Sequence, residues 1–452
     1  MSTEKSKNYI FENNVLSFES YVNEFTSVLF KEFDATAEKI SLKSKIEDLM
    51  LGKVVNKTEN QAAWHPKYRS NGGSSLILEN DIELFDYERH PLKEKIIVKQ
   101  NVKNLVTLGI GGSYEGPKLL IEAFGKPPLK RGWNSIFITG PDQDEFNFKL
   151  SGLKPDETFF VVSSKSFTTD ETIESLKLAI EWSGRMENFV AITANKKEAK
   201  KYNIPKIIEF EKEIGGRYSI WSEISKPAFH WTDSEVPYDV NKLQFISGGI
   251  AADEDLLNNA DYLKFLKNLV YSDIWLNNSQ GKNTRAVLSY SWRLRSLADY
   301  VQQLEMESLG KQPNKNSPFK KTGQIIFGGY GPTAQHSYFQ LLHQGTQNIC
   351  ADIVAIKDNK ESLAYAQAMT QSKLLSLGAD GLLNNEEKIN GNIPLNLFLL
   401  NKLDEYSLGY LIATWEHRIY ITAVMLGINP FDQYGVSAGK IFTRKYLEEN
   451  GG

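Results

Sequence analysis

The stretch TFFVVSSKSFTTDETIESLKLAI, residues 158–180, combines the signals of a buried strand and of a helix. Its first part, TFFVVS, is rich in β-branched and aromatic residues, which is typical of a strand in a parallel sheet. Its last part carries apolar residues at the spacing of one helix face. Thr168 and Glu171 have the spacing of a capping box, which predicts that the helix starts at this point. A strand that leads into a helix is the basic unit of an α/β fold.

The same alternation recurs in two parts of the chain. Between residues 100 and 200, and again from about residue 284, short apolar runs are separated by helical patterns. The runs are NLVTLGI (104–110), SIFITG (135–140), FVAITAN (189–195), TRAVLSYSW (284–292), GQIIFGG (323–329) and DIVAIK (352–357). This pattern predicts mainly parallel sheets with helices on both faces, and ligands beyond the carboxyl ends of the strands. We therefore expect two doubly wound α/β units.

The remaining pattern suggests where these units begin and end. Apolar residues at helical spacing from residue 15 to 50 predict helices before the first sheet. Residues 233–260 are interpreted as a connection between the units. We expect an N-terminal helical region at residues 1–65 that packs on the second unit, a first unit at 66–232 and a second at 233–452.

Composition limits the classes of function. The 452-residue chain has a formal net charge of −4, which offers no global attraction for nucleic acid or anionic lipid. Its single cysteine, Cys350, excludes an internal disulfide. The sequence has no signal-peptide pattern and no apolar run of the ~18–20 residues needed to span a bilayer. We expect a cytoplasmic protein that binds neither membranes nor nucleic acid.

Hydroxyl groups and one lysine follow the strand at residues 158–163. A helix N-terminus attracts anions through its free N–H groups and its dipole, and nearby hydroxyls and an ammonium group add donors and charge. These features suit a terminal phosphate monoester. The alternative is an ordinary helix start, because Asp170 and Glu171 could satisfy the free N–H groups themselves. The candidate phosphate residues are Ser164, Lys165, Ser166 and Thr169.

The loop GIGGS, residues 109–113, follows another predicted strand. Glycines at Gly109, Gly111 and Gly112 would let the backbone approach a ligand closely, and Ser113 adds a hydroxyl. The spacing is neither GxGxxG of a dinucleotide site nor a P-loop. Two loops of this kind at one sheet edge can converge on a single phosphate, although Gly-Gly turns after strands are common.

The second half of the chain carries candidate acid–base residues. Gln303 and Glu307 are four apart on one predicted helix face, and Glu307 could act as a general base. His336 and His343 are seven apart, but no third ligand accompanies them, so a metal site is not indicated. The other candidates are Arg217, Gln433 and Lys440. For each charged candidate the alternative is an ordinary surface side chain.

Six motifs occur together in one order: GIGGS, SSKSFTTDET, GGRYSIWS, QQLEMESLGK, QHSYFQLLHQGT and INPFDQYGVSAGK. In this combination the chain closely resembles the phosphoglucose isomerase family from about residue 105 to 440. The resemblance implies two sugar-isomerase domains and the reversible conversion of glucose 6-phosphate to fructose 6-phosphate in glycolysis and gluconeogenesis. It implies no metal or organic cofactor. It also implies a homodimer in which a histidine from one subunit enters the site of the other.

The resemblance assigns roles to individual residues. Glu307 matches the base that moves a proton between C1 and C2 through a cis-enediol, and Arg217 matches the charge that stabilises the enediolate. His336 and Lys440 match the residues that act in ring opening. The substrate contacts are matched by Ser113, Ser164, Lys165, Ser166, Thr169, Gln303 and Gln433.

The chain departs from the family pattern at a few positions. Ser166 replaces a threonine, Glu115 a leucine, GPTAQHS lacks the usual Asn-Gly, and GPDQDEF replaces the usual loop. Two alternatives stay open. One is a phosphosugar-binding module without catalysis, which would not need Glu307, Arg217, His336 and Lys440 together. The other is an isomerase that also accepts mannose 6-phosphate.

Overall fold

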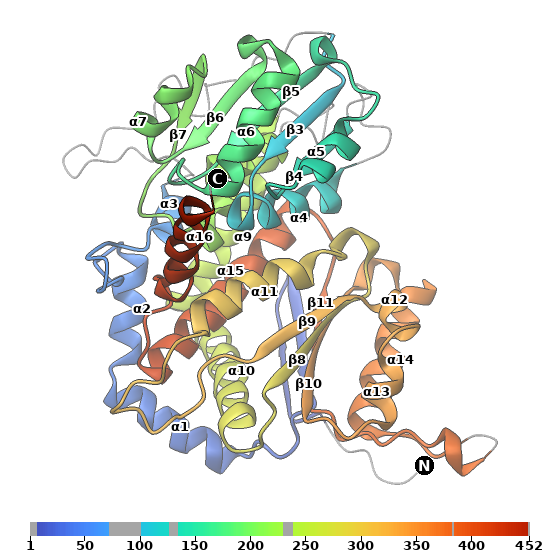
Figure 1. Cartoon of the computed structure of the whole chain (residues 1–452). Helices are drawn as coiled ribbons and strands as arrows, with labels where there is room; N and C mark the ends of the chain where they lie inside the picture. The colour runs from blue at the N-terminus through green and yellow to red at the C-terminus, as the bar shows by residue number, and fades with distance from the viewer. Residues whose placement is uncertain (1–6, 72–100, 126–133, 229–237, 382–383, 451–452) are drawn as a thin grey trace.

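The computed structural model describes residues 7–71, 101–125, 134–228, 238–381 and 384–450. Its strands form two separate sheets, seen at the top and in the lower part of Figure 1. The first sheet has five parallel strands in the order β4-β3-β5-β6-β7. They are β3 (Asn104–Leu108), β4 (Asn134–Ile138), β5 (Thr158–Ser163), β6 (Phe189–Thr193) and β7 (Lys206–Glu209). The α/β prediction is therefore confirmed, and β7 was not predicted.

The central strands of this sheet are apolar on both sides, and helices bury one of its faces. Val106, Phe160 and Val162 reach a cluster that contains residues of α5 (Gln143–Leu150) and α6 (Asp170–Ser183). Phe159 and Val161 reach a second cluster on the opposite face. The described residues of this part also form helices α4 (Glu115–Phe124) and α7 (Lys196–Ala199).

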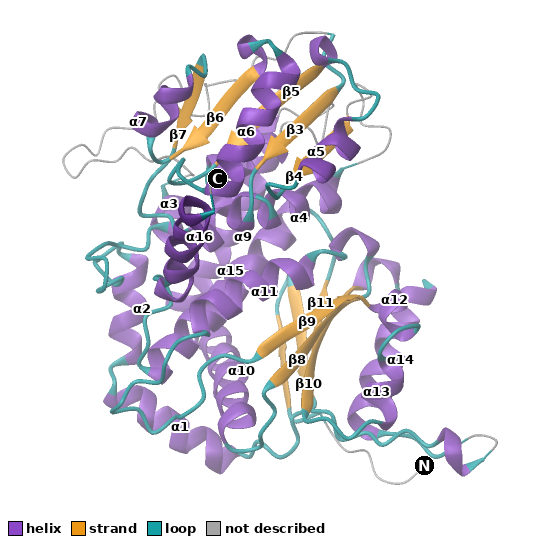
Figure 2. Cartoon of the chain, in the orientation of Figure 1, coloured by secondary structure: helices purple, strands orange, loops and turns teal. Residues whose placement is uncertain are grey.

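The second sheet has six strands in the order β1-β2-β11-β10-β8-β9. Four are mutually parallel: β8 (Thr284–Ser289), β9 (Ile325–Tyr330), β10 (Ile349–Ile356) and β11 (Leu395–Leu400). One face packs on α10 (Ala260–Asn278), α11 (Leu297–Leu309) and α15 (Glu405–Leu426). The other packs on α12 (Gly331–Gln335), α13 (Phe339–Gln344) and α14 (Leu363–Leu377), as the layers in Figure 2 show.

The N-terminal region is helical only in part. Residues Tyr9–Glu12 (β1) and Leu16–Ser20 (β2) form an antiparallel hairpin, and β2 pairs antiparallel with β11. The prediction of helix from residue 15 is therefore wrong over β2. Leu16 and Phe18 are fully buried at the spacing of two that is typical of a strand. The segment forms a strand because it can pair with the edge of β11. The following helices α1 (Ser27–Lys39) and α2 (Leu42–Met50) agree with the prediction, whereas α3 (His65–Ser70) lies beyond the residues for which helix was predicted.

Most of residues 233–260, interpreted from the sequence as a connection between the units, are helical. Residues Tyr238–Asn258 form helix α9, which lies against α15 in the middle of the molecule (Figure 1). Gly248 and Gly409 make this contact close: a Cβ on Gly248 would lie 1.9 Å from the Tyr406 carbonyl oxygen, and one on Gly409 would lie 2.0 Å from that of Phe245. The predicted boundary at residues 232–233 lies outside the described residues.

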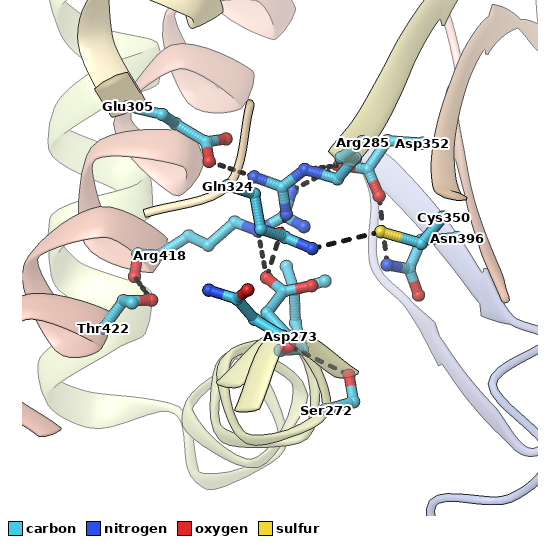
Figure 3. Close-up of polar contacts among 12 residues, drawn as sticks. Ser272, Asp273, Arg285, Glu305, Gln324, Cys350, Asp352, Asn396, Arg418 and Thr422 are labelled. Carbon is cyan, nitrogen blue, oxygen red and sulfur yellow. Dashed lines mark hydrogen bonds and ion pairs between the residues drawn. The ribbon is translucent and has the colours of Figure 1, made fainter. Parts of the chain in front are cut away.

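A cluster of buried charges lies between α15 and the second sheet (Figure 3). Asp352 on β10 accepts a hydrogen bond from Arg418 Nη1 at 2.7 Å, and Arg418 Nε donates to Asp273 at 2.7 Å. Arg285 on β8 pairs with Glu305 and with Asp273. Each of these side chains is at least nine-tenths buried. The cluster thus joins α10, α11 and α15 to the sheet by ion pairs as well as by apolar packing.

The chain ends in helix α16 (Ser437–Glu449), every residue of which is exposed. Arg444 holds this helix beside the first sheet's α6 through two hydrogen bonds to Asp170, at 2.8 and 3.1 Å. Within the described part of the chain, no helix is long and apolar enough to cross a membrane.

Candidate active site

Three segments meet beyond the carboxyl end of β3. The short helix η2 (Gly111–Ser113) lies against η6 (Gly216–Trp221), and Gly111 lies beside α11. A Cβ on Gly112 would lie 1.9 Å from the Gly216 carbonyl oxygen, and one on Gly111 would lie 3.0 Å from Gln303 Nε2. Only glycine at position 112 allows the two backbones to approach this closely. The glycine loop therefore serves first to join the two halves of the candidate site.

Arg217 lies at the centre of four polar side chains. We call them the Arg217 cluster: Arg217, Gln303, Glu307 and Gln433. Its guanidinium donates from Nε to Glu307 Oε2 at 2.8 Å and from Nη2 to Gln433 Oε1 at 2.9 Å. Gln303 Nε2 lies 3.4 Å from the same oxygen of Glu307. The structure thus brings together four of the predicted site residues from three separate segments.

Glu307 faces this cluster and not the core. Its side chain is 31% exposed, whereas that of Arg217 is 3% exposed. The neighbouring glutamate, Glu305, points the other way and is buried against Arg285 and Trp415. Leu304 and Leu309 also point into the core. A carboxylate that is accessible from one side and held by an arginine on the other can exchange a proton with a ligand.

The loop after β5 has a different internal arrangement from the one predicted. Helix α6 begins at Asp170 with Thr169 as its N-cap residue, and Thr169 makes no side-chain capping bond. The prediction of a capping box formed by Thr168 and Glu171 is therefore wrong. The Thr168 hydroxyl instead donates a hydrogen bond to the Ser166 hydroxyl at 2.9 Å. The Thr169 hydroxyl lies 3.2 Å from that of Ser164.

Ser164 stabilises the loop itself. It is 4% exposed, and its hydroxyl accepts a hydrogen bond from the Phe167 N–H at 3.1 Å. Phe167 is buried with a φ of 54°, a left-handed conformation that bulky residues seldom adopt. The Ser164 hydroxyl thus helps hold the turn that presents Ser166 and Thr169, both of which are accessible.

Lys165 is a half-buried residue of the same loop, and its charge interacts with that of Arg217. Burial lowers the pKa of its ammonium group, the carboxylates of Glu59 and Glu213 oppose that change, and the positive charge of Arg217 adds to it. Ser113 lies next to Gly109, which also lies close to the end of β5 at Ser163. The predicted phosphate residues therefore surround one edge of the first sheet, near Arg217.

Glu115, a departure from the family pattern, begins helix α4 two residues after Ser113. Burial raises its pKa to about 7, which Lys118 partly opposes, and its Oε2 atom is buried without a hydrogen-bond partner. A neutral carboxyl group here would avoid repelling an anion at the neighbouring loop.

His336 and Lys440 do not join the Arg217 cluster within this chain. His336 is exposed just after α12 and lines a surface hollow of about 360 Å³ with His343 and Gln371. Lys440 is exposed on α16. Among the described residues, neither side chain makes a hydrogen bond or an ion pair. His343 instead bonds Gln371 at 2.9 Å.

The described residues contain no group of three or more histidine, cysteine, aspartate or glutamate side chains that could hold a metal ion. Cys350 is buried, and burial raises the pKa of its thiol to about 12. A thiol of this kind is unreactive. The chemistry available to the candidate site is that of Glu307, Arg217, the hydroxyls and the lysines.

Sequence reasoning missed three contributors to the site. The carbonyl oxygens of Pro430 and Asp432 accept hydrogen bonds from Arg217 at 2.5 and 3.2 Å. Ser219 donates to the Gly216 carbonyl at 2.7 Å and to that of Gly112 at 3.2 Å. In each of these contacts the acceptor is a main-chain carbonyl oxygen, which every residue possesses, so residue type gave no signal for it.

Comparison with known proteins gives consistent results. The family model described as phosphoglucose isomerase matches residues 21–451. A glucose-6-phosphate isomerase of Legionella pneumophila (strain Paris) is 32% identical over 426 residues, which cover 89% of this chain and 83% of that protein. One from Coxiella burnetii (strain RSA 493 / Nine Mile phase I) is 32% identical over 466 residues, covering 91% and 83%.

Solved structures share the fold. The crystal structure of a glucose-6-phosphate isomerase from Chlamydia trachomatis superposes with a TM-score of 0.82 at 24% identity, covering 98% of this chain and 90% of that one. A hypothetical protein from Thermus thermophilus superposes with a TM-score of 0.67 at 20% identity, covering 94% and 98%.

Proposed function

This chain belongs to the phosphoglucose isomerase family and interconverts glucose 6-phosphate and fructose 6-phosphate, and we propose that the Arg217 cluster carries the chemistry. The observation that supports this assignment is the 2.8 Å contact between Arg217 Nε and Glu307 Oε2 beside the glycine loop. It pairs a carboxylate that can take a proton with a cation that can stabilise the resulting negative oxygen. The reaction is a step of glycolysis and gluconeogenesis.

In the proposed mechanism, Glu307 is the base. Its carboxylate removes the proton from C2 of the open-chain aldose; the electrons of that C–H bond form the C1–C2 double bond, and the electrons of the C1–O1 double bond move to O1. A proton then passes from the C2 hydroxyl to O1 within the cis-enediol. Glu307 returns its proton to C1 while the electrons on O2 form the C2–O2 double bond, which yields the ketose. Arg217 stabilises the negative charge that develops on the oxygens of the enediolate, and Gln303 and Gln433 contact the sugar.

We further propose that Ser113, Lys165, Ser166 and Thr169 bind the substrate's phosphate at the end of the first sheet, with Ser164 supporting the loop. Accessible hydroxyls at the start of α6, the helix dipole and the Lys165 charge all favour a dianion here. The phosphate is far from C1 and C2 in the sugar, so its charge hardly changes during proton transfer. Its binding energy therefore contributes to the ground and transition states alike.

Thr169→Val is expected to raise KM with a much smaller change in kcat. Thr169 makes no capping bond, so the substitution removes a phosphate donor without removing a helix cap. A hydrogen bond to a charged group contributes about 1.5–3 kcal/mol, which corresponds to roughly 10–150-fold in affinity. Steady-state kinetics would measure both constants, with Thr169→Ser as the control that keeps the hydroxyl. A large fall in kcat at unchanged KM would place the phosphate elsewhere.

We propose that His336 and Lys440 act in ring opening, and that His336 reaches the site of a second subunit. Two observations support this: His336 is exposed, and it shares no hydrogen bond with the described residues of its own Arg217 cluster. Ring opening moves a proton between the C1 hydroxyl and the ring oxygen, which requires groups at both positions. A homodimer would supply the histidine by its symmetry.

His336→Ala is expected to reduce turnover of cyclic glucose 6-phosphate by on the order of 10²-fold, the low end for a lost acid–base group. An open-chain sugar phosphate that needs no ring opening should lose much less. Rapid kinetics on both substrates would check this. Equal losses on the two substrates would contradict the assigned role.

The location of His336 can be tested by mixing subunits. When inactive Glu307→Gln and His336→Ala chains are denatured and refolded together, each hybrid dimer should contain a single intact site, and activity should return. Recovery requires the histidine to come from the other subunit. A mixture as inactive as its two components would show that each site is built within one chain.

The experiment that tests the function as a whole is a coupled assay on the purified protein, with glucose 6-phosphate and mannose 6-phosphate compared in parallel. Turnover of the first supports the assignment, and turnover of both would extend it. Binding of glucose 6-phosphate without turnover would instead favour a phosphosugar-binding module. A cytoplasmic location, a homodimer and sugar-isomerase domains at residues 66–232 and 233–452 are likewise proposed on the family relationship.

A further inference from the structure

The orientation of Arg217 is set mainly by a loop from the far end of the chain. Apart from Glu307 and Gln433, the acceptors of its guanidinium are the carbonyl oxygens of Pro430 and Asp432. Because a guanidinium is planar with donors in a fixed fork, these acceptors determine which way the group faces. A shift of the 430–433 loop would therefore turn Arg217 relative to Glu307.

One lysine joins this loop to the helix that carries Glu307. Lys311 lies four residues after Glu307. It directly follows Gly310, the C-cap residue of α11. Its ammonium group lies 3.0 Å from Asp432 Oδ1 and also donates to the Asp432 carbonyl oxygen, which is itself an acceptor for Arg217. Lys311 and Arg217 thus share one acceptor atom.

The Asp432 carboxylate also accepts hydrogen bonds on its other oxygen. Its Oδ2 atom accepts hydrogen bonds from Thr58 Oγ1 at 2.8 Å and from Asn429 Nδ2 at 3.0 Å. The side chains of Lys311 and Asp432 are only 16% and 10% exposed, so this pair is shielded from water far more than an ordinary surface ion pair. The carboxylate therefore holds the loop firmly between α11 and the segment around Thr58.

We propose that Lys311 and Asp432 are positioning residues, which orient the Arg217 guanidinium toward Glu307 by holding the 430–433 loop against the end of α11. This inference rests on the proposed role of Arg217. Neither side chain is placed against the substrate, so both act through Arg217. Small displacements of catalytic groups are costly, since misplacement by about 1 Å can reduce a rate 10²-fold.

The first test is Lys311→Met, which removes the ammonium group and keeps most of the apolar stem. We expect kcat to fall by roughly 10–100-fold and KM for glucose 6-phosphate to rise by a much smaller factor, because the phosphate loop lies on a different segment and only the Gln433 contact with the sugar shares the 430–433 loop. Lys311→Arg, which restores donors to Asp432, should recover much of kcat. Asp432→Asn provides a second route to the same result and keeps the side-chain shape.

The control is Lys267→Met. Lys267 forms a 2.6 Å ion pair with Asp34 and is 22% exposed, similar to Lys311, but it joins α10 to α1. If loss of a partly buried ion pair reduced activity through general destabilisation, this variant would lose activity as well. We expect it to keep the kcat of the unmodified protein.

A double-mutant cycle separates this proposal from the proposed function. Arg217→Lys alone should reduce kcat. When Lys311→Met is added to the Arg217→Lys protein, kcat should fall by less than about a further twofold. An unchanged kcat in Arg217→Lys would overturn the role of Arg217 itself. The inference fails if Arg217→Lys lowers kcat but Lys311→Met then lowers kcat by the same factor with Arg217 and with Lys at position 217. It also fails if Lys311→Met leaves kcat unchanged in both proteins, because Lys311 then does not act through Arg217.

Discussion

Glu307→Gln is expected to reduce kcat for glucose 6-phosphate by about 10²–10⁴-fold while leaving substrate binding largely intact. Glutamine keeps the size of the side chain and an oxygen that can accept from Arg217, but it cannot take a proton from carbon. The Arg217 contact at 2.8 Å should therefore survive in a neutral form. Steady-state kinetics and a binding measurement with an unreactive sugar phosphate would check the two halves of this expectation.

The matched control is Glu198→Gln. Glu198 is 25% exposed and pairs with Lys201 at 2.6 Å, so it resembles Glu307 in exposure and in having one cationic partner. This variant should retain full activity. A Glu307→Gln enzyme with near-normal turnover would contradict the assignment of the base.

Solvent isotope incorporation gives independent evidence for the same step. A proton held by Glu307 between its removal from C2 and its return to C1 can exchange with solvent. In D₂O the product should therefore carry deuterium at the carbon that receives the proton. A direct transfer of hydride from C2 to C1 would leave the product without solvent deuterium.

Asp352→Ala is expected to have the largest effect on stability, about 3–5 kcal/mol, because it leaves Arg285 and Arg418 buried with too few carboxylates. Asp352 is fully buried, accepts from Arg418 at 2.7 Å and from Asn396 at 3.0 Å, and lies 3.4 Å from Arg285 Nε (Figure 3). The shift of the urea unfolding midpoint would measure the loss. A change within about 1 kcal/mol, the range of a surface pair, would contradict it.

The control is Asp48→Ala, which removes a partly exposed partner of Lys53 at 2.7 Å and should lower the free energy of unfolding by no more than about 1 kcal/mol. The contribution of Asp352 also depends on pH. Burial alone would raise its pKa, but the positive charges of Arg418 and Arg285 hold it below the usual value. Its stabilising effect is therefore complete above the unfolded pKa of about 3.9 and is lost as the pH falls through the lower, folded pKa.

Local pattern was enough to predict much of this protein. The strand and helix at residues 158–183 depend on periodicities of two and 3.6 residues within a single segment, and the structure has both. The six motifs also identified the family, because each is a short run of residue types. The proximity of Gln303 to Glu307 follows likewise from their spacing on one helix.

Only the tertiary structure decided the features that depend on distant partners. β2 is a strand because β11, hundreds of residues later, offers it an edge, and Gly248 and Gly409 allow α9 and α15 to pack closely. Arg217 meets the Pro430 carbonyl across 213 residues of chain. Each of these contacts involves main-chain atoms of a distant segment, which every residue possesses, so residue type does not encode the partner. The folded chain alone determines which segments meet.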